Sequence, residues 1–301
     1  MRCCPILFFA IALFLSINNI LYGCNTSHLT DEKSTYDEQA DMAFIKYLIS
    51  RGDFVEALFL LDDLEVTTSV LTDSVNYYKG WTLYQQKALL SSAGYLLEVS
   101  DRSPLYPKSR FFGAYNLAHS GQYVQAKEAI GQFNSHKSEL YEAMSNFQLS
   151  GIALLERDMS VFTELSGHYS GRYNAFAAQE QYMLQHFNTL INRPTRSPVI
   201  AGMLSAVVPG LGKIYAGKRG EGIAGFLYTM ALGATAYDFY RGGGVNSAWF
   251  IVSGSIASLF YIGNIWGSVT AVHRNNIEFN YEIDQRILFD MHIPLRNAFS
   301  W

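Results

Sequence analysis

The side chains that most often carry out chemistry are few in this chain and are scattered along it. Its histidines show no metal-ligand spacing, so we expect no metal site and no cofactor. The run Gly242-Gly243-Gly244 lacks the Lys-Ser/Thr pair that completes a phosphate-binding loop, and no nucleophile elbow is present. Asp62-Asp63 lies among leucines and is predicted to be the polar face of a helix rather than a metal pair. These observations predict a protein that is not an enzyme.

The net charge of -4 argues against nucleic acid as the main partner, because phosphate binding needs a basic face. Only 16% of the residues are charged and 49% are hydrophobic, whereas typical soluble domains have about 25% charged residues. The deficit is concentrated in residues 197–272, and residues 31–196 have an ordinary mix of charges. The composition therefore predicts a soluble part followed by a membrane part.

Residues 1–24 have the pattern of a secretory signal. Arg2 precedes an apolar run from Pro5 to Tyr22, and polar residues follow it. The run is also long enough to span a bilayer, so a permanent anchor is the alternative. Cys24 follows Leu21-Tyr22-Gly23 in a way that resembles a bacterial lipobox, which implies lipidation of Cys24. Ordinary cleavage nearby, with Cys24 incidental, stays open.

An internal repeat organises the soluble part. The segment Gly52-Asp53-Phe54-Val55-Glu56-Ala57 recurs as Gly121-Gln122-Tyr123-Val124-Gln125-Ala126, two periods of about 34 residues later, and Ala93 stands where a middle copy needs a small residue. This spacing resembles the tetratricopeptide repeat over residues 35–191. The resemblance implies antiparallel helix pairs stacked into a solenoid that binds a protein partner.

The packing positions of this repeat recur in all three copies. A small residue early in each second helix should allow close approach to the first helix, with a large apolar residue four positions later and another nine positions earlier. The small residues are Ala57, Ala93 and Ala126, the later residues are Leu61, Leu97 and Ile130, and the earlier residues are Leu48, Tyr84 and Leu117. Tyr141 to Glu156 and Asp158 to Leu165 form a degraded fourth copy, and Asn174 to Ile191 is an amphipathic helix that could cap the array.

A proline-marked linker at residues 192–198 leads to a predicted transmembrane module at residues 199–273. Its apolar stretches are Val199 to Leu211, Ile223 to Tyr240 and Ala248 to Val272. The second and third are long enough to span as helices. The first is short and interrupted by Pro209-Gly210, so it could be a short span, a re-entrant segment or an interfacial helix.

The distribution of basic residues favours three crossings. Lys213, Lys218 and Arg219 precede the second stretch, His273 and Arg274 follow the third, and Arg241 alone lies between them. With three crossings, both basic clusters would lie in the cytoplasm and the repeats outside, in agreement with the export signal. With two crossings, exported repeats would leave the basic clusters outside, against the positive-inside rule.

The segment from Pro209 to Arg219 is the most specific motif in the chain. It resembles the turn of the two-helix transmembrane domain family through Pro209, Gly210, Gly212, Tyr215 and Gly217, although Lys213-Ile214-Tyr215 replaces the usual Asp-Arg-Phe. The stretch from Tyr261 to Gly267 resembles the last helix of an uncharacterised bacterial group that joins tetratricopeptide repeats to such a module. The resemblance implies an architecture and no mechanism.

Small and polar residues in the third stretch predict helix packing. Gly263 and Gly267 form a small-xxx-small pair, and Asn264 should hydrogen-bond to a neighbouring helix. A polar lining for a path or ligand is the alternative for Asn264. The tail, residues 274–301, is predicted to be amphipathic, with Phe279, Ile283 and Ile287 on a face that lies on the membrane or docks on the module.

Together these patterns predict an all-α fold, a helical-hairpin repeat solenoid followed by a small transmembrane helical module. They predict a non-enzymatic adaptor or scaffold of the bacterial cell envelope. It would contact membrane lipid and an unidentified protein partner, and neither nucleic acid nor metal. The expected location is the inner membrane, with the repeats on the periplasmic side. The alternative is an accessory subunit of a transport or channel system.

Overall fold

The computed structural model describes residues 40–66, 68–133 and 138–299. The described chain is helical and contains no strand, which confirms the expected all-α class. It forms two compact units, Met1–Asn134 and Ser135–Trp301. The division falls between the third and fourth expected repeats and not at the expected linker, residues 192–198. The signal-like residues 1–24, including Cys24, lie outside the described residues.

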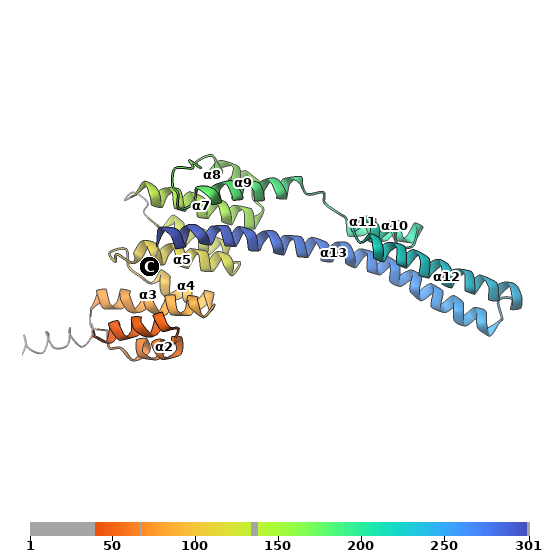
Figure 1. Ribbon diagram of the computed structural model, residues 1–301, viewed down its shortest axis with the longest axis horizontal. Coiled ribbons are helices and arrows are strands. Elements are labelled where there is room, and N and C mark those ends of the chain that lie inside the picture. Colours follow the sequence, from red (N-terminus) through yellow and green to blue (C-terminus); the bar gives the residue numbers. More distant parts are fainter. Residues whose placement is uncertain (1–39, 67, 134–137, 300–301) are drawn as a thin grey trace, which may run out of the picture. The chain divides into compact units, whose positions relative to one another are not determined.

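The N-terminal unit consists of helical hairpins (Figure 1). A helix over described residues 40–51 precedes α2, and α3 with α4 and α5 with α6 follow as pairs. The bounds are Phe54–Asp63 for α2, Ser69–Gln85 for α3, Leu89–Leu97 for α4, Tyr106–His119 for α5 and Tyr123–Gly131 for α6. In the C-terminal unit, α7 (Glu139–Glu156) and α8 (Met159–Ser166) form one more hairpin. The second helix of each hairpin begins roughly 35 residues after the previous one.

One turn geometry recurs in all four hairpins. Gly52, Lys87, Gly121 and Arg157 occupy the same position in it, and each has a positive φ of 64° to 87°. In each case the next residue donates its backbone N–H to a carbonyl five residues earlier, as Asp53 does to Leu48 at 3.0 Å. These bonds satisfy the carbonyls that a helix leaves free at its C-terminus. The two glycines mark the turn in the sequence, but lysine and arginine adopt the same conformation.

The small residues of the repeat are buried. Ala57, Ala93 and Ala126 are at most 1% exposed. Of the larger residues predicted to pack with them, Leu97 is half-buried and the others are buried, namely Leu48, Leu61, Tyr84, Leu117 and Ile130. Two glycines also allow close helix approach in this unit: Gly80, which stands where the repeat motif uses a glycine, and Gly113, which no sequence motif singled out. A Cβ at Gly80 would lie 2.7 Å from Leu96 Cγ, and one at Gly113 would lie 2.8 Å from Leu97 Cδ2.

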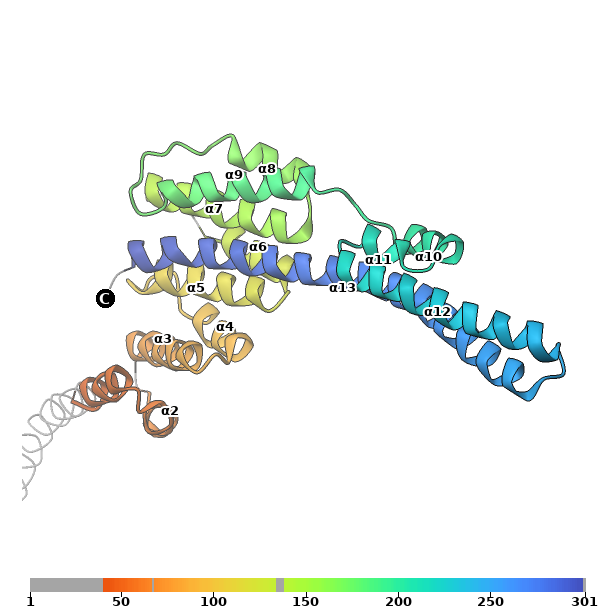
Figure 2. The ribbon, with the colours of Figure 1, turned by 45° about the vertical axis from the view of Figure 1, so that its right-hand side comes forward.

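The C-terminal unit is built along one long helix, α13 (Ala248–Ala298), which has 51 residues. Its N-terminal half packs against α10, α11 and α12, and its C-terminal half packs against α7 and α9 (Figures 1 and 2). The remaining bounds are Ala177–Asn192 for α9, Pro198–Val207 for α10, Leu211–Tyr215 for α11 and Arg219–Gly243 for α12. The expected boundary at residue 273 does not interrupt α13, so the last apolar stretch and the tail form one helix.

The tail docks on the repeat helices of its own unit. Ile283 and Ile287 are 3% and 0% exposed. Phe279 lies under the guanidinium of Arg193, 3.6 Å from its ring centroid. Of the two open expectations for this face, docking on protein is the one that the structure supports, although α7 and α9 cover Ile283 and Ile287 rather than the apolar module.

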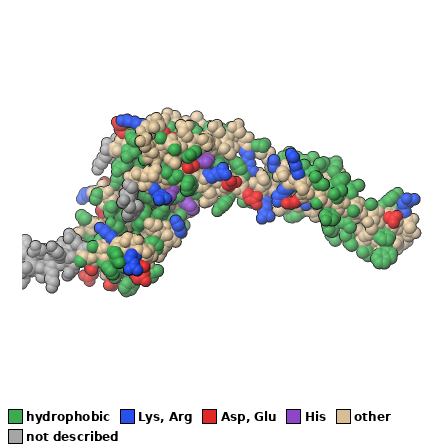
Figure 3. All heavy atoms as spheres, in the orientation of Figure 1, with side chains coloured by type: hydrophobic (Ala, Val, Ile, Leu, Met, Phe, Trp, Pro, Cys, Tyr) green, Lys and Arg blue, Asp and Glu red, His purple; other side chains and the backbone are tan. Residues whose placement is uncertain are grey.

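Among the described helices, α13 is the one that is both long and apolar enough to cross a membrane, judged by length and composition. Only 6% of its most apolar window is buried, so it is not the core helix of a globular domain. Hydrophobic side chains gather on the surface of α12 and the N-terminal half of α13 (Figure 3). The structure thus supports a membrane helix in this unit.

The first apolar stretch turns back on itself. α10 has only ten residues, about 15 Å at 1.5 Å per residue. It ends before Pro209, and Gly210 adopts a φ of +90°. The chain then returns in α11, so that Ser197 N–H donates to the Tyr215 hydroxyl at 3.1 Å. The two ends of α10–α11 therefore lie together, which fits a re-entrant segment or an interfacial helix better than a span of its own.

Candidate functional site

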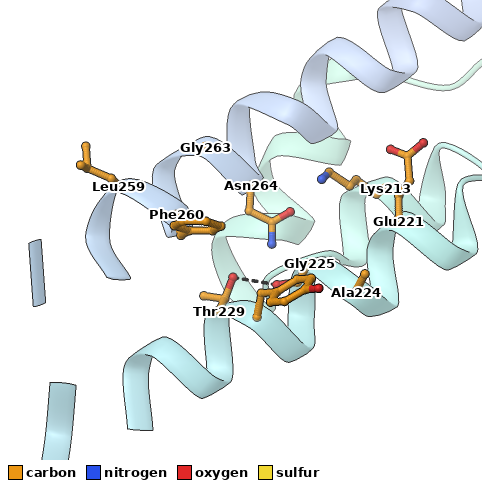
Figure 4. A pocket seen from close by; sticks show the side chains of 10 residues that line it. Lys213, Glu221, Ala224, Gly225, Thr229, Leu259, Phe260, Gly263 and Asn264 are labelled. Carbon is orange, nitrogen blue, oxygen red and sulfur yellow. Dashed lines mark hydrogen bonds between the residues drawn. The ribbon is translucent and has the colours of Figure 1, made fainter. Parts of the chain in front are cut away.

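A pocket of about 590 Å³ opens between α11, α12 and α13. Lys213 comes from α11, and Leu259, Phe260, Gly263 and Asn264 come from α13. α12 contributes the stripe Glu221, Ala224, Gly225, Tyr228 and Thr229. Residues spaced by three or four share one face of a helix, which is why this part of α12 lines one wall. Figure 4 shows the pocket residues of α11 and α12 across from Asn264.

Close backbone contacts place α11, and with it Lys213. A Cβ at Gly212 would lie 2.0 Å from the carbonyl oxygen of Ala201, and a Cβ at Gly222 would lie 2.6 Å from the carbonyl oxygen of Gly210. Only glycine fits at such contacts with rigid backbone. The sequence motif therefore acts by packing: its glycines hold the turn against α10 and α12.

A hydroxyl pair fixes the same turn to α13. Ser205 and Ser268 have their hydroxyl oxygens 2.6 Å apart, and the Gly212 N–H donates to the Ser205 hydroxyl at 3.0 Å. Both serines are fully buried. Tyr215 packs beside the buried Ala201 and Val272 on the same side of the turn. These bonds give the wall behind Lys213 a defined geometry.

Asn264 is the least satisfied polar group of the pocket. It is 6% exposed, yet neither its Oδ1 nor its Nδ2 has a hydrogen-bond partner. Its side chain lies over Gly225, where an added Cβ would come within 3.0 Å of Oδ1. The expected bond from Asn264 to a neighbouring helix is absent, because the residue that faces it on α12 has no side chain. A buried, unpaired amide is costly, by about 1–3 kcal/mol.

Two opposite charges flank the mouth of the pocket. No carboxylate of the described residues lies within ion-pair distance of Lys213. Glu221 is paired with Lys218 at 3.4 Å, in an exposed pair of the kind that contributes little stability. Along the groove the lining changes from charged residues to the amide of Asn264 and then to Leu259 and Phe260. The site can thus hold a ligand that has charged, polar and apolar parts in that order.

The sequence motifs identified only part of this site. Asn264 and Gly263 line the pocket. Gly267 lies beneath the Lys213 side chain, and a Cβ added at Gly267 would lie 3.3 Å from Lys213 Cε. Gly263 has no atom within 4 Å of an added Cβ, so it borders open space and not a helix contact as expected. Pro209, Gly210, Gly212, Tyr215 and Gly217 belong to the turn behind the pocket.

Other lining residues were missed as site residues. Lys213 entered the sequence argument as a basic residue at a membrane edge and as a departure from the family motif, and Glu221 did not enter it. The spacing of Glu221, Gly225 and Thr229 at successive helical turns is the signal that could have found this wall. The repeat-packing residues up to Ile130 lie in the N-terminal unit and take no part in the pocket.

A second polar cluster ties the linker to α13. The Arg193 guanidinium donates to the carbonyl of Asn275 and to the side chain of Asn276, at 3.3 and 3.1 Å. The Asn276 amide donates to the Arg196 carbonyl at 3.2 Å, and Arg196 itself donates to the Ala216 carbonyl at 2.8 Å. The linker, the end of α11 and the middle of α13 therefore meet at one level. Within the described residues, no cluster of three potential metal ligands occurs.

The chain matches no protein-family model, no curated protein and no solved structure.

Proposed function

We propose that the protein is a non-enzymatic, membrane-anchored adaptor whose helical hairpins bind a protein partner in the bacterial envelope. The observation that carries this proposal is the continuity of α13. One uninterrupted helix pairs with α12 in its apolar half and with α7 and α9 in its C-terminal half. A rigid helix shared by an anchor and a repeat hairpin is what a scaffold needs.

The contacts at the C-terminal half of α13 support a fixed connection. His186 Nε2 lies 2.7 Å from Asp290 Oδ2, and both side chains are nearly buried. Arg157 Nη1 lies 2.7 Å from Asp284 Oδ1, within ion-pair distance although not aligned as a hydrogen bond. Breaking the nearly buried contact between His186 and Asp290 is costly, because each side chain would lose its polar partner. The α7–α8 hairpin would therefore follow any movement of the anchor.

Exposed apolar side chains on the hairpins mark where a partner could be sought. Val55, Leu90 and Val124 occupy the second position of α2, α4 and α6 and are 70%, 55% and 63% exposed. The second helices of three successive hairpins thus each expose an apolar side chain at the same position. Such a row of similar contacts suits an extended or helical partner.

The adaptor proposal is tested by photo-crosslinking in cells. A photoreactive phenylalanine analogue replaces Val55, Leu90 or Val124 in the full chain, and Glu139 serves as the exposed control position. The proposal expects the same partner protein to be captured from at least two of the three positions and not from Glu139. Failure to capture a common partner from any two positions, at normal protein level, would count against an adaptor.

We place the hairpins on the periplasmic side because residues 1–24 have the pattern of an export signal. The return of α10–α11 means that Arg193, Arg196 and Arg219 share one end of the α12–α13 pair, the end toward the α7–α8 hairpin of the same unit. By the positive-inside rule that end would instead be cytoplasmic. Fusions of a phosphatase that is active only in the periplasm, placed after Arg219 and after Gly243, show on which side of the membrane each end of α12 lies. Activity after Arg219 alone supports export, and activity after Gly243 alone overturns it.

The second candidate is an accessory subunit of a transport or channel system. The unpaired amide of Asn264 favours it, since polar groups at membrane depth often line a path. Substrate uptake or ion flux that is lost in Asn264→Leu, while the crosslinked partner is still captured, would favour this function over the adaptor.

A further inference from the structure

We propose that the pocket between α11, α12 and α13 is a binding site for one phospholipid that carries a primary amine, with phosphate at Lys213 and ammonium at Glu221. This inference goes beyond the adaptor function and does not depend on it. It rests on three observations: the charges at the mouth, the unpaired amide below them, and the apolar wall beyond.

The order of these groups along the helices matches the order of groups in a phospholipid. Glu221 is near the start of α12, and Thr229 lies roughly 12 Å further along the axis at 1.5 Å per residue. On α13, Asn264 is one turn from Phe260. The charged side chains thus lie at the level of headgroups, and Leu259 and Phe260 lie where acyl chains run.

The charges select the headgroup. Lys213 has no carboxylate partner in the described chain and can hold a phosphate oxygen as a point charge. Glu221 has only the exposed Lys218 as a partner, at 3.4 Å, and is 59% exposed, so it can accept hydrogen bonds from a primary ammonium. A trimethylated amine has no N–H to donate, and a glycerol headgroup has no cation. The pair therefore favours an aminophospholipid over both.

The amide of Asn264 gives the site its deeper contact. Its Nδ2 can donate to an ester carbonyl of the lipid, the first acceptor below the phosphate, and so gain the bond that the protein does not supply. The polar hydrogen of Thr229 is already used, because its hydroxyl donates to the Gly225 carbonyl at 2.7 Å. Of these two side chains, Asn264 is therefore the one whose polar atoms have no partner in the protein.

The test uses the full-length protein, purified in mild detergent and loaded with phosphatidylethanolamine, phosphatidylcholine or phosphatidylglycerol of identical acyl chains. Native mass spectrometry measures which lipid is retained. We expect phosphatidylethanolamine to be retained preferentially by the wild type. Lys213→Gln and Asn264→Leu should each weaken its retention about tenfold.

Two features keep the test independent of folding. Glu221→Gln, at the exposed mouth, should abolish the preference for phosphatidylethanolamine over phosphatidylcholine while lipid is still retained. Arg274→Gln and Ser258→Leu are matched controls, since both residues lie on α13 outside the pocket, and they should behave as the wild type.

Four outcomes overturn the proposal. The first is equal retention of the three lipids, and the second is unchanged retention in Lys213→Gln. The third is displacement of the lipid by free phosphoethanolamine or inorganic phosphate, which would show that a soluble anion fills the site. The fourth is a dimer of the wild type that Asn264→Leu dissociates, which would show that a second copy supplies the partner of the amide.

Discussion

The side-chain amide of Gln148 in α7 donates a buried hydrogen bond of 2.7 Å to the backbone carbonyl of Met291 in α13. One turn further along α7, Gly151 faces the side chain of the same methionine. An added Cβ at Gly151 would lie 2.6 Å from both Cγ and Sδ of Met291. The absence of a side chain at Gly151 thus permits the approach that the Gln148 bond then fixes.

Gly151→Ile should loosen the docking of α7 on α13. The branched side chain cannot fit against Met291 without moving one helix, and overpacking of this kind costs about 1–3 kcal/mol. Faster hydrogen exchange of the α7 amides in the full-length protein would register the loss. Gly131→Ile is the matched control, because nothing lies within 4 Å of a Cβ at Gly131. In this variant the hydrogen exchange of the α7 amides should stay close to that of the wild type. Equal protection of α7 in both variants would contradict the proposed contact.

The hydrogen-bonded side chains of His186 and Asp290 should behave as a coupled unit. Asp290→Leu or His186→Leu alone leaves one nearly buried polar partner, at a cost of about 1–3 kcal/mol. The double variant removes both polar groups, so its destabilisation should be smaller than the sum of the two. Hydrogen exchange of the α9 amides, measured in the wild type, the two single variants and the double variant, gives the three destabilisation energies. Additive effects would show that the two residues stabilise α9 separately.

Lys87→Gly should stabilise the N-terminal unit by up to about 1 kcal/mol, because Lys87 has a φ of +65° that glycine adopts without strain. The gain is reduced by the loss of the lysine ammonium over the Tyr84 ring, at 5.6 Å. Urea unfolding followed by fluorescence of the buried Trp81 measures the change. Gln125→Gly, inside α6, is the control and should destabilise by about 1 kcal/mol. A destabilised Lys87→Gly would mean that the turn does not need the positive φ.

Lys108 should make the N-terminal unit more stable as the pH rises above about 8. Burial lowers the pKa of Lys108 from 10.5 to about 8, and its ammonium lies 5.2 Å from the Trp81 ring centroid. Between these two values the unfolded chain binds more protons than the folded one, so the free energy of unfolding increases with pH. The desolvation penalty is fully present below the folded pKa and is relieved as the amine loses its proton.

Comparison with Lys108→Met isolates this effect from other titrating groups. The Trp81-monitored unfolding midpoint of the wild type should rise relative to that of Lys108→Met between pH of about 8 and about 10. Burial also raises the pKa of Tyr77, so measurements are best kept below the range where unfolded tyrosines ionise. Parallel pH profiles for the two proteins would show that the Lys108 amine titrates at its usual pKa.

Local patterns determined much of the fold. The helical class, the four hairpins and the burial of Ala57, Ala93 and Ala126 follow from periodicity and small-residue spacing. The turn glycines Gly52 and Gly121 were visible because glycine favours positive φ. Lys87 and Arg157 were not, because the same backbone hydrogen bonds hold a non-glycine residue in that conformation.

The candidate site was less visible in the sequence. The sequence identified Asn264 and the motif glycines as candidate residues. It also predicted a hydrogen bond from Asn264 to a neighbouring helix, which is absent because the facing residue, Gly225, has no side chain. Lys213 and Asn264 come together only because α11 turns back along α13. That return depends on Gly212 and Gly222 touching backbone of other segments, and such contacts leave no periodic signal.

The sequence by itself determined where helices form, which faces are apolar and where charge is scarce. The tertiary structure decided that residues 248–298 form one helix, that α10–α11 returns to its starting level, and that the tail face meets α7 and α9. The reason is physical. Periodicity specifies that a face must be covered, but only packing between distant segments decides whether lipid or another helix covers it.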